Sequence, residues 1–478
     1  MRGVIREFRE APAVWGAVLF LLAVVQTTMS AMTIMTANAA WAQAVPALRE
    51  RAAIFRSEMA LPLVTTVIVA VLVVLSVVSA AIQQRRRSLA LLALHGATPW
   101  QLTWRICTQV LCLSALAAAV SLIVSPLLAR VLYPTATSQL ESAGLVFQAV
   151  PISGTLASWA LGAILAVSVA LVAALLTVRP IGRIPPVEAL RSASTPPRTV
   201  GRVRGVLAVL SVLAALAAFA VGLATTRPTS MSAMTARLTF STMTPMFAGC
   251  TVGMLLLVVA LCLAGPPTLA RTVTLWTGLV RLPAASWQVA RGQAAARARA
   301  SSSTVIPLTA GLILLMFFRD LSLIIDAWSR LLPAGLRGQF EVPGFARTLA
   351  LLAPAMLVVL AGVCAGYLIA ARGRVLDLAL VSVGGADRGQ LNRIAALDGL
   401  MTVVTALLLA LATSTVAAGM FVLAELRSFG VATPVVPWPE WLLVAIALAG
   451  LGMLASWLTV RGSLQASPAA TIARFTGE

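Results

Sequence analysis

Long apolar runs constrain this chain more than any other feature of its sequence. Ten apolar stretches follow one another, and each is close to the roughly 20 residues that a helix needs to cross a bilayer. Apolar residues make up 60% of the chain and charged residues only 10%, a balance that excludes a water-soluble globule. The sequence therefore predicts an all-α polytopic membrane protein with spans near 12–34, 61–82, 103–129, 151–178, 205–225, 244–265, 303–324, 349–371, 394–424 and 438–460.

The first and seventh stretches differ from the rest. Arginines precede the first, as in a signal peptide, but its apolar run from Ala11 to Met35 exceeds the roughly 7–15 residues of a cleavable one. We expect an uncleaved helix. In the seventh stretch, Arg319, Asp320 and Asp326 interrupt the outer end. Its last turns are therefore expected to leave the membrane.

Arginine placement predicts the orientation. All 35 basic residues are arginine, and 24 of them fall on the side of the N-terminus against 11 on the other side. Because basic residues concentrate on the cytoplasmic side of membrane proteins, we expect a multi-pass protein of the bacterial cytoplasmic membrane with both termini in the cytoplasm. The arginines are scattered between apolar runs and form no basic domain, so nucleic-acid binding is not expected.

Residues for catalysis or metal binding are scarce. The chain has one histidine, His95, to which we assign no catalytic role, and five cysteines that lie inside apolar runs. Neither a metal site nor a disulfide set is expected. A Walker A motif needs a lysine to reach the nucleotide phosphates, and the chain has no lysine. It therefore cannot use this phosphate-binding chemistry itself.

One cytoplasmic turn occurs twice. Residues 85–102 read RRRSLALLALHGATPWQL and residues 374–391 read RVLDLALVSVGGADRGQL. At a shift of 289 positions, eight of these eighteen residues are identical. The identical pairs are Arg85/Arg374, Leu89/Leu378, Ala90/Ala379, Leu91/Leu380, Gly96/Gly385, Ala97/Ala386, Gln101/Gln390 and Leu102/Leu391.

Both copies predict the same local structure. Gly96 and Gly385 supply the left-handed residue that ends a helix. Thr98 is followed three residues later by Gln101, and Asp387 stands in the same relation to Gln390. This spacing is a capping box. Each copy is thus predicted to form a helix, a glycine stop and a newly capped helix that re-enters the membrane.

Apolar residues continue beyond the membrane boundary in both copies. A plain hairpin between spans is the alternative reading, but it gives no reason for them, since apolar side chains there need a protein partner or the lipid interface. We therefore expect both turns to be docking surfaces. The residues concerned are Leu89, Leu91, Leu92 and Leu94 in the first copy and Leu378, Leu380, Val381 and Val383 in the second.

A second repeated feature extends the duplication. Arg179 precedes Pro186 by seven residues, and Arg461 precedes Pro468 by the same distance, each after the last span of a group of four. The expected domains are a first four-span unit (1–200), a two-span connector (201–285) and a second four-span unit (286–478).

The turns resemble the FtsX/MacB-type permeases of ABC transporters. That family has a motif similar to R-x-R-E-I-A-L-L-R-A-L-G-A-x-x-x-Q after its second span and ends each unit in a motif similar to D-P-x-E-A-L-R. The matching segments here are 85–101 and 186–191, with weaker second copies at 374–390 and 468–474. The chain departs from the pattern where Ser88 and Asp377 replace the family's glutamate, and where the second terminal motif lacks Glu-Ala-Leu.

The resemblance implies a non-catalytic permease subunit that works with a separate ABC ATPase. Two ATPase copies, one under each turn, would bind the ATP and Mg²⁺, and this chain would hold no cofactor. Arg85 and Arg374 would lie at the inner headgroup level. The turn residues that would couple to the ATPase are Arg85, Leu89, Leu91, Leu92, Gly96, Ala97, Thr98 and Gln101, and Arg374, Asp377, Leu378, Leu380, Gly385, Ala386, Asp387 and Gln390.

Cargo and alternatives are less constrained. Short outer loops and apolar spans favour a hydrophobic or amphipathic cargo, such as a lipid, peptide or drug, taken from the membrane lipids. One alternative is an ion-coupled secondary transporter, which needs carboxylates within the membrane; none lies centrally in an apolar stretch. The other is an ATPase-coupled signalling scaffold without transport. An accessory extracytoplasmic protein stays open as a further partner.

Overall fold

Helices account for nearly all of the structure. It is a computed structural model, and it describes residues 12–42, 49–142, 156–181, 202–226, 228, 236–280, 282–298, 301–332 and 344–464. Within these ranges, ten helices are long and apolar enough to cross a membrane. The chain is therefore an all-α polytopic membrane protein, as the apolar runs predict.

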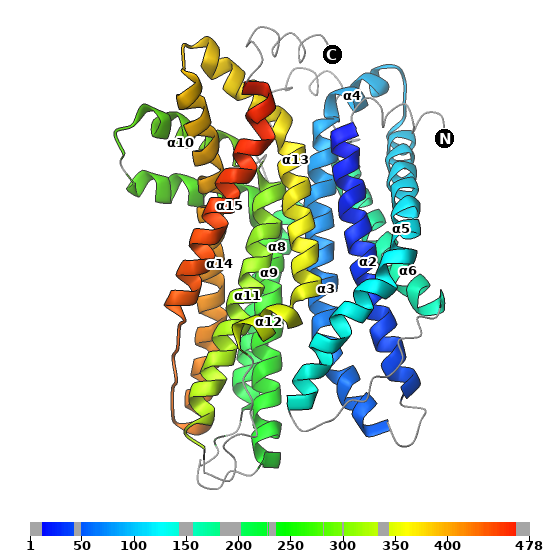
Figure 1. The fold of residues 1–478 in the computed structure, drawn as a ribbon, viewed down its shortest axis with the longest axis vertical. Helices are drawn as coiled ribbons and strands as arrows, with labels where there is room; N and C mark the ends of the chain where they lie inside the picture. Colours follow the sequence, from blue (N-terminus) through cyan, green and yellow to red (C-terminus); the bar gives the residue numbers. More distant parts are fainter. Residues whose placement is uncertain are drawn as a thin grey trace.

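The first unit is a bundle of four spans. Its helix α2 packs against the other three spans, and a short helix, α4, connects the second span to the third. The unit lies on the right in Figure 1. Its helices are α2 (Pro12–Ala42), α3 (Arg49–Gln84), α4 (Arg86–Leu94), α5 (Pro99–Ser142) and α6 (Leu156–Ile181).

The second unit and the connector form the rest of the molecule. The two connector spans pack on each other and on α14, so the connector belongs spatially with the second unit. The connector helices are α8 (Arg202–Thr225) and α9 (Ala236–Leu279). The remaining helices are α10 (Ala285–Arg297), α11 (Ser302–Ser329), α12 (Phe345–Leu351), α13 (Ala353–Val383), α14 (Arg388–Phe429) and α15 (Trp438–Leu464).

Contacts between the two units are reciprocal. Helix α13 packs on α2 and α3, and α11 packs on α3. Since α11 and α13 occupy the positions in their unit that α2 and α3 occupy in theirs, the α2–α13 and α3–α11 contacts correspond to each other. Between them, a Cβ atom on Gly362 would lie 2.2 Å from Cγ1 of Val73.

Val73 and Gly362 differ by 289 positions, the shift that relates the two turns. Equivalent residues thus meet at the centre of the contact, which is the property of an interface with two-fold symmetry. This arrangement supports the predicted duplication. The domain boundaries at 200 and 285 stay predictions, and the terminal motifs at 186–191 and 468–474 lie outside the described residues.

The seventh span is longer than predicted. Helix α11 continues as one helix to Ser329, and Arg319 and Asp320 are buried in the bundle. That its last turns leave the membrane stays a prediction. The charges are accommodated because α15 supplies polar partners, described below. The third and ninth spans exceed their predicted lengths at both ends. Helices α5 and α14 begin at the caps of the two turns rather than at the first apolar residue, and both continue beyond their predicted ends.

Candidate functional site

The first turn ends one helix and starts the next within four residues. Gly96 has a φ of 90°, a left-handed conformation that favours glycine. Its N–H donates to the Ala93 carbonyl (3.0 Å), and the Ala97 N–H donates to the Leu92 carbonyl (3.1 Å). These two bonds form a Schellman motif, which satisfies carbonyls at the end of α4.

A capping box then starts α5. The Thr98 N–H donates to Gln101 Oε1 (3.0 Å), and the Gln101 N–H donates to Thr98 Oγ1 (3.3 Å). The predicted glycine stop and capping box are confirmed at this turn.

The second turn repeats this geometry. Gly385 has a φ of 93°, and its N–H donates to the Ser382 carbonyl (3.0 Å), while the Ala386 N–H donates to the Val381 carbonyl (3.4 Å). Asp387 and Gln390 form the second capping box at the start of α14. Both turns lie at the same end of the bundle (Figure 1), which we call the turn end.

The two helices that enter the turns differ in one respect. Helix α13 runs unbroken to Val383, whereas the first copy breaks at Arg85 between α3 and α4. The Arg85 N–H donates to the Ile82 carbonyl (3.0 Å), a tight turn of the 3₁₀ type. Helix α4 is therefore a separate short helix in the first unit only.

Apolar residues of the predicted docking surfaces divide into a buried and an exposed set. Leu89 and its equivalent Leu378 are buried and hold the turns onto the bundle. Leu91 and its equivalent Leu380 are 44% and 55% exposed. Leu92 packs partly on the core. Docking to a partner would thus rest on the exposed leucines, with Leu94 and Val383 beside them.

Two ion pairs brace the second turn. Arg297 of α10 pairs with Asp377, and Arg374 Nε lies 3.0 Å from Asp398 Oδ2 of α14. Arg374 is only 3% exposed, and its guanidinium also lies over the Tyr367 ring at 4.7 Å. Arg374 is therefore buried within the protein beside Asp398, and its place at the headgroup level stays a prediction.

The first turn cannot form these two ion pairs. Ser88 and Gln109 occupy the positions equivalent to Asp377 and Asp398, and both are neutral. Arg85, the equivalent of Arg374, lies over the Trp15 ring of α2 at 5.5 Å. The two turns thus share their backbone geometry and differ in how the surrounding helices hold them.

Comparison with known families agrees with the turn geometry. A family model described as FtsX-like permease C-terminal matches residues 61–186, from α3 through the first turn and α5 to just beyond α6. This match supports the predicted resemblance to the FtsX-like permease family. Among curated proteins, no match to the chain was found.

The match to residues 61–186 indicates the broad class of this protein. FtsX-like permeases are typically non-catalytic transmembrane components of ABC-type systems, and the family implies partnership with an ABC ATPase. The resemblance predicted from residues 85–101 is confirmed. In the described part of the chain, no group of three or more His, Cys, Asp or Glu side chains could hold a metal ion.

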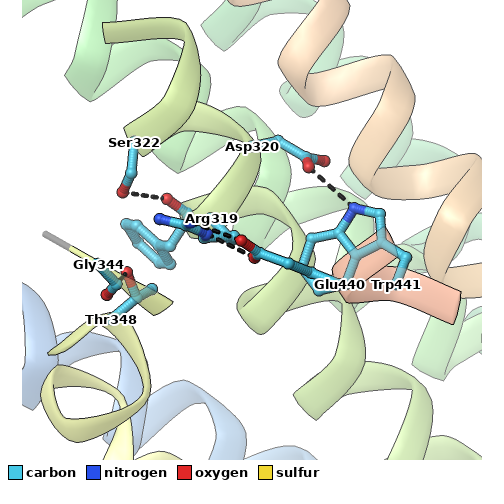
Figure 2. Close-up of polar contacts among 8 residues, drawn as sticks. Arg319, Asp320, Ser322, Gly344, Thr348, Glu440 and Trp441 are labelled. Atoms are coloured by element: carbon cyan, nitrogen blue, oxygen red, sulfur yellow. Dashed lines mark hydrogen bonds and ion pairs between the residues drawn. The ribbon is translucent and has the colours of Figure 1, made fainter. Parts of the chain in front are cut away.

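A polar cluster lies in the second unit, away from the turn end. Figure 2 shows Arg319 of α11 donating twice to Glu440 of α15, from Nε to Oε2 (2.7 Å) and from Nη2 to Oε1 (2.6 Å). Beside this pair, Trp441 Nε1 donates to Asp320 Oδ1 (3.1 Å). Two-point pairing of this kind is the strongest form of arginine–carboxylate contact.

Sequence reasoning missed the buried carboxylates. Asp320, Asp398 and Glu425 are all buried within spans of the second unit. Glu425 accepts hydrogen bonds from the Thr433 N–H (3.1 Å) and Oγ1 (2.7 Å). The sequence did contain one signal of this burial, because Arg319 and Asp320 interrupt an apolar run. Charged side chains inside spans face protein rather than lipid.

Proposed function

We propose that this chain is the transmembrane subunit of an ATP-driven ABC system and that a separate ATPase drives it mechanically. The observation that carries the proposal is the pair of equivalent turns at one end of the bundle. Each turn has a left-handed glycine, a capping box and an exposed leucine, Leu91 in the first and Leu380 in the second. Equivalent surfaces on one face suit two copies of one partner.

The partner supplies the energy. This chain has no lysine and therefore no Walker A phosphate loop, so ATP and Mg²⁺ bind in the ATPase. One ATPase docks under each turn, and the single chain presents both turns. The turn end faces the cytoplasm of a bacterium, as the arginine distribution predicts, and the chain itself is not an enzyme.

Movement passes from the turns to the centre of the bundle. Each turn joins a helix of the reciprocal interface, α3 or α13, to a long helix, α5 or α14, that follows it. When the two ATPases close, they displace the turns, and the attached helices carry this displacement as rigid elements. A hinge or shear change at the α3–α13 contact is the physical form of the switch.

Cargo and transport are further parts of the proposal. Exposed apolar side chains cover the outer faces of the spans, which favours a hydrophobic or amphipathic cargo that enters from the bilayer. The signalling scaffold is the nearest rival, since it uses the same turns. The ion-coupled transporter gains support from the buried carboxylates, but Asp320, Asp398 and Glu425 each have a protein partner.

Docking through the exposed leucines is tested by changing their polarity. The variant Leu91→Asp/Leu380→Asp should lose ATPase association, because each aspartate places a charge in an apolar contact. The readout is co-purification of the complex from detergent. Leu331→Asp is the matched control, since Leu331 is exposed beyond α11 at the opposite end and its variant should retain the ATPase.

The stoichiometry of the purified complex distinguishes an ATPase-driven subunit from an ion-coupled transporter. One permease chain with two ATPases is the expected result. A folded chain that retains no ATPase would overturn the proposal. Sensitivity of cargo movement to an ionophore, with no effect of ATP, would then identify an ion-coupled transporter.

A further inference from the structure

A hairpin projects sideways from the bundle near the turn end. We call it the side hairpin: residues 266–297, comprising the last turns of α9, the connection that follows and α10. Figure 1 shows its two helical segments on the left, away from the vertical spans. Pro266 and Pro267 stand where α9 leaves the span that ends at Gly265, and proline is a usual cause of a sharp helix bend.

The contacts of its inner face show at which level along the bundle the side hairpin lies. Trp287, Ala290 and Ala294 of α10 share one buried cluster with α14 residues at 391–395, where the apolar run of that span begins. Trp276 Nε1 donates to Thr405 Oγ1 of α14 (3.1 Å), about three turns further into the span. The side hairpin therefore lies beside the bundle between the level where the span enters the bilayer and about three turns further in.

Its outer face is apolar as well. Leu275 is 70% exposed and Leu279 is 85% exposed, and Leu282 and Val289 are exposed beside them. These residues follow the span that ends at Gly265, so they are not part of a spanning segment. A helix pair with one face on the protein and an apolar outer face at the membrane surface is suited to the lipid interface.

The charge of the side hairpin is of one sign. Residues 266–297 contain four arginines and no acidic residue. Arg297 pairs with Asp377, while Arg271 is exposed and Arg291 is half-buried. Basic side chains beside an apolar face complement a membrane surface that carries anionic headgroups.

We propose that the side hairpin lies in the leaflet at the turn end, from the headgroup region inward, and binds anionic phospholipids there. Leu275, Leu279 and Leu282 contact the acyl chains, and Arg271 and Arg291 contact the phosphates. This site needs only the membrane insertion of the chain, so it stands independently of the ATPase proposal.

Membrane contact is tested with a fluorophore on the full chain in nanodiscs. Leu279→Cys is labelled in a background in which the native cysteines (Cys107, Cys112, Cys250, Cys262 and Cys364) are alanine. Phospholipids with a spin-labelled acyl chain should quench this probe strongly. Val383→Cys is the matched control, because Val383 is exposed on the second turn beyond the membrane and its probe should be quenched little. Equal quenching at both positions would overturn the proposal.

Selectivity for anionic lipid is tested by exchanging the labelled lipid. Quenching at Leu279 should be stronger with spin-labelled phosphatidylglycerol than with phosphatidylcholine, and each of Arg271→Gln and Arg291→Gln should lower the preference by about five-fold. An unchanged preference in the double variant would overturn the role of the arginines.

Native mass spectrometry of the chain with its own cysteines provides a second measurement. Arg271→Gln/Arg291→Gln should retain less phosphatidylglycerol than Arg427→Gln, which removes an exposed charge at the opposite end. Equal retention in these two variants would likewise contradict the site.

Discussion

At the scale of single residues, the second unit places charges inside the bundle and gives each one a partner. Arg374 is enclosed by Asp398 and the Tyr367 ring, and Arg319 by Glu440. Such pairs add little stability relative to a well-packed apolar pair, but breaking one leaves a buried charge without compensation. Their effect is therefore to fix how helices meet rather than to raise stability.

The Arg374–Asp398 pair gives a prediction about stability. Asp398→Asn should lower the free energy of unfolding by about 3–5 kcal/mol, because it leaves the buried guanidinium without its counter-charge. Arg374→Gln/Asp398→Asn should be less damaging than Asp398→Asn alone. Unfolding in mixed micelles titrated with SDS measures both.

An exposed pair provides the control for that series. Arg330 Nη2 lies 2.5 Å from Asp326 Oδ2 one turn away, and Arg330→Gln should cost no more than about 0.5 kcal/mol. If Asp398→Asn is as mild as this control, the buried pair does not fix the helices.

At the scale of elements, features that depend on residues close together in the sequence could be predicted, and contacts between residues far apart in the sequence could not. The glycine stops and capping boxes depend on residues two to five positions apart, so residues 85–102 alone predict them. Arg319 and Glu440 lie 121 positions apart, and their pairing depends on how α11 and α15 pack, which periodicity does not specify. For the same reason, the sequence does not show that Leu91 is exposed and Leu89 is buried. Of these two leucines, only the exposed Leu91 can contact a partner.

The glycine stop makes a prediction about coupling. Gly96→Val forces a β-branched residue into the left-handed region, at a cost of roughly 1–2 kcal/mol, so α4 should lose its fixed angle to α5. ATPase binding through Leu91 should persist in part, while permease-stimulated ATP hydrolysis falls. ATPase activity of the reconstituted complex is the measurement.

Gly205→Val is the matched control for the coupling experiment. Gly205 lies in α8 without positive φ, and a Cβ there meets no atom within 4 Å. Stimulated hydrolysis should be normal in this variant. Normal stimulation in Gly96→Val too would show that the left-handed stop is not required.

At the scale of the whole molecule, the reciprocal interface is the contact through which the units must move. Cysteines at positions 73 and 362 should form a disulfide, since a Cβ atom on residue 362 would lie directly against the side chain of residue 73. Under oxidising conditions Val73→Cys/Gly362→Cys should stop ATP-driven activity, and reduction should restore it. Activity that persists after complete cross-linking would place the movement elsewhere.

The difference between the two turns has a consequence for the evolution of the chain. In a homodimer, any substitution in one turn appears in both, so a turn braced by two ion pairs cannot coexist with a turn that lacks them. Joining both units in one polypeptide removes that constraint, and Asp377 and Asp398 have no acidic counterpart at positions 88 and 109. The two turns are therefore free to diverge in how firmly the surrounding helices hold them.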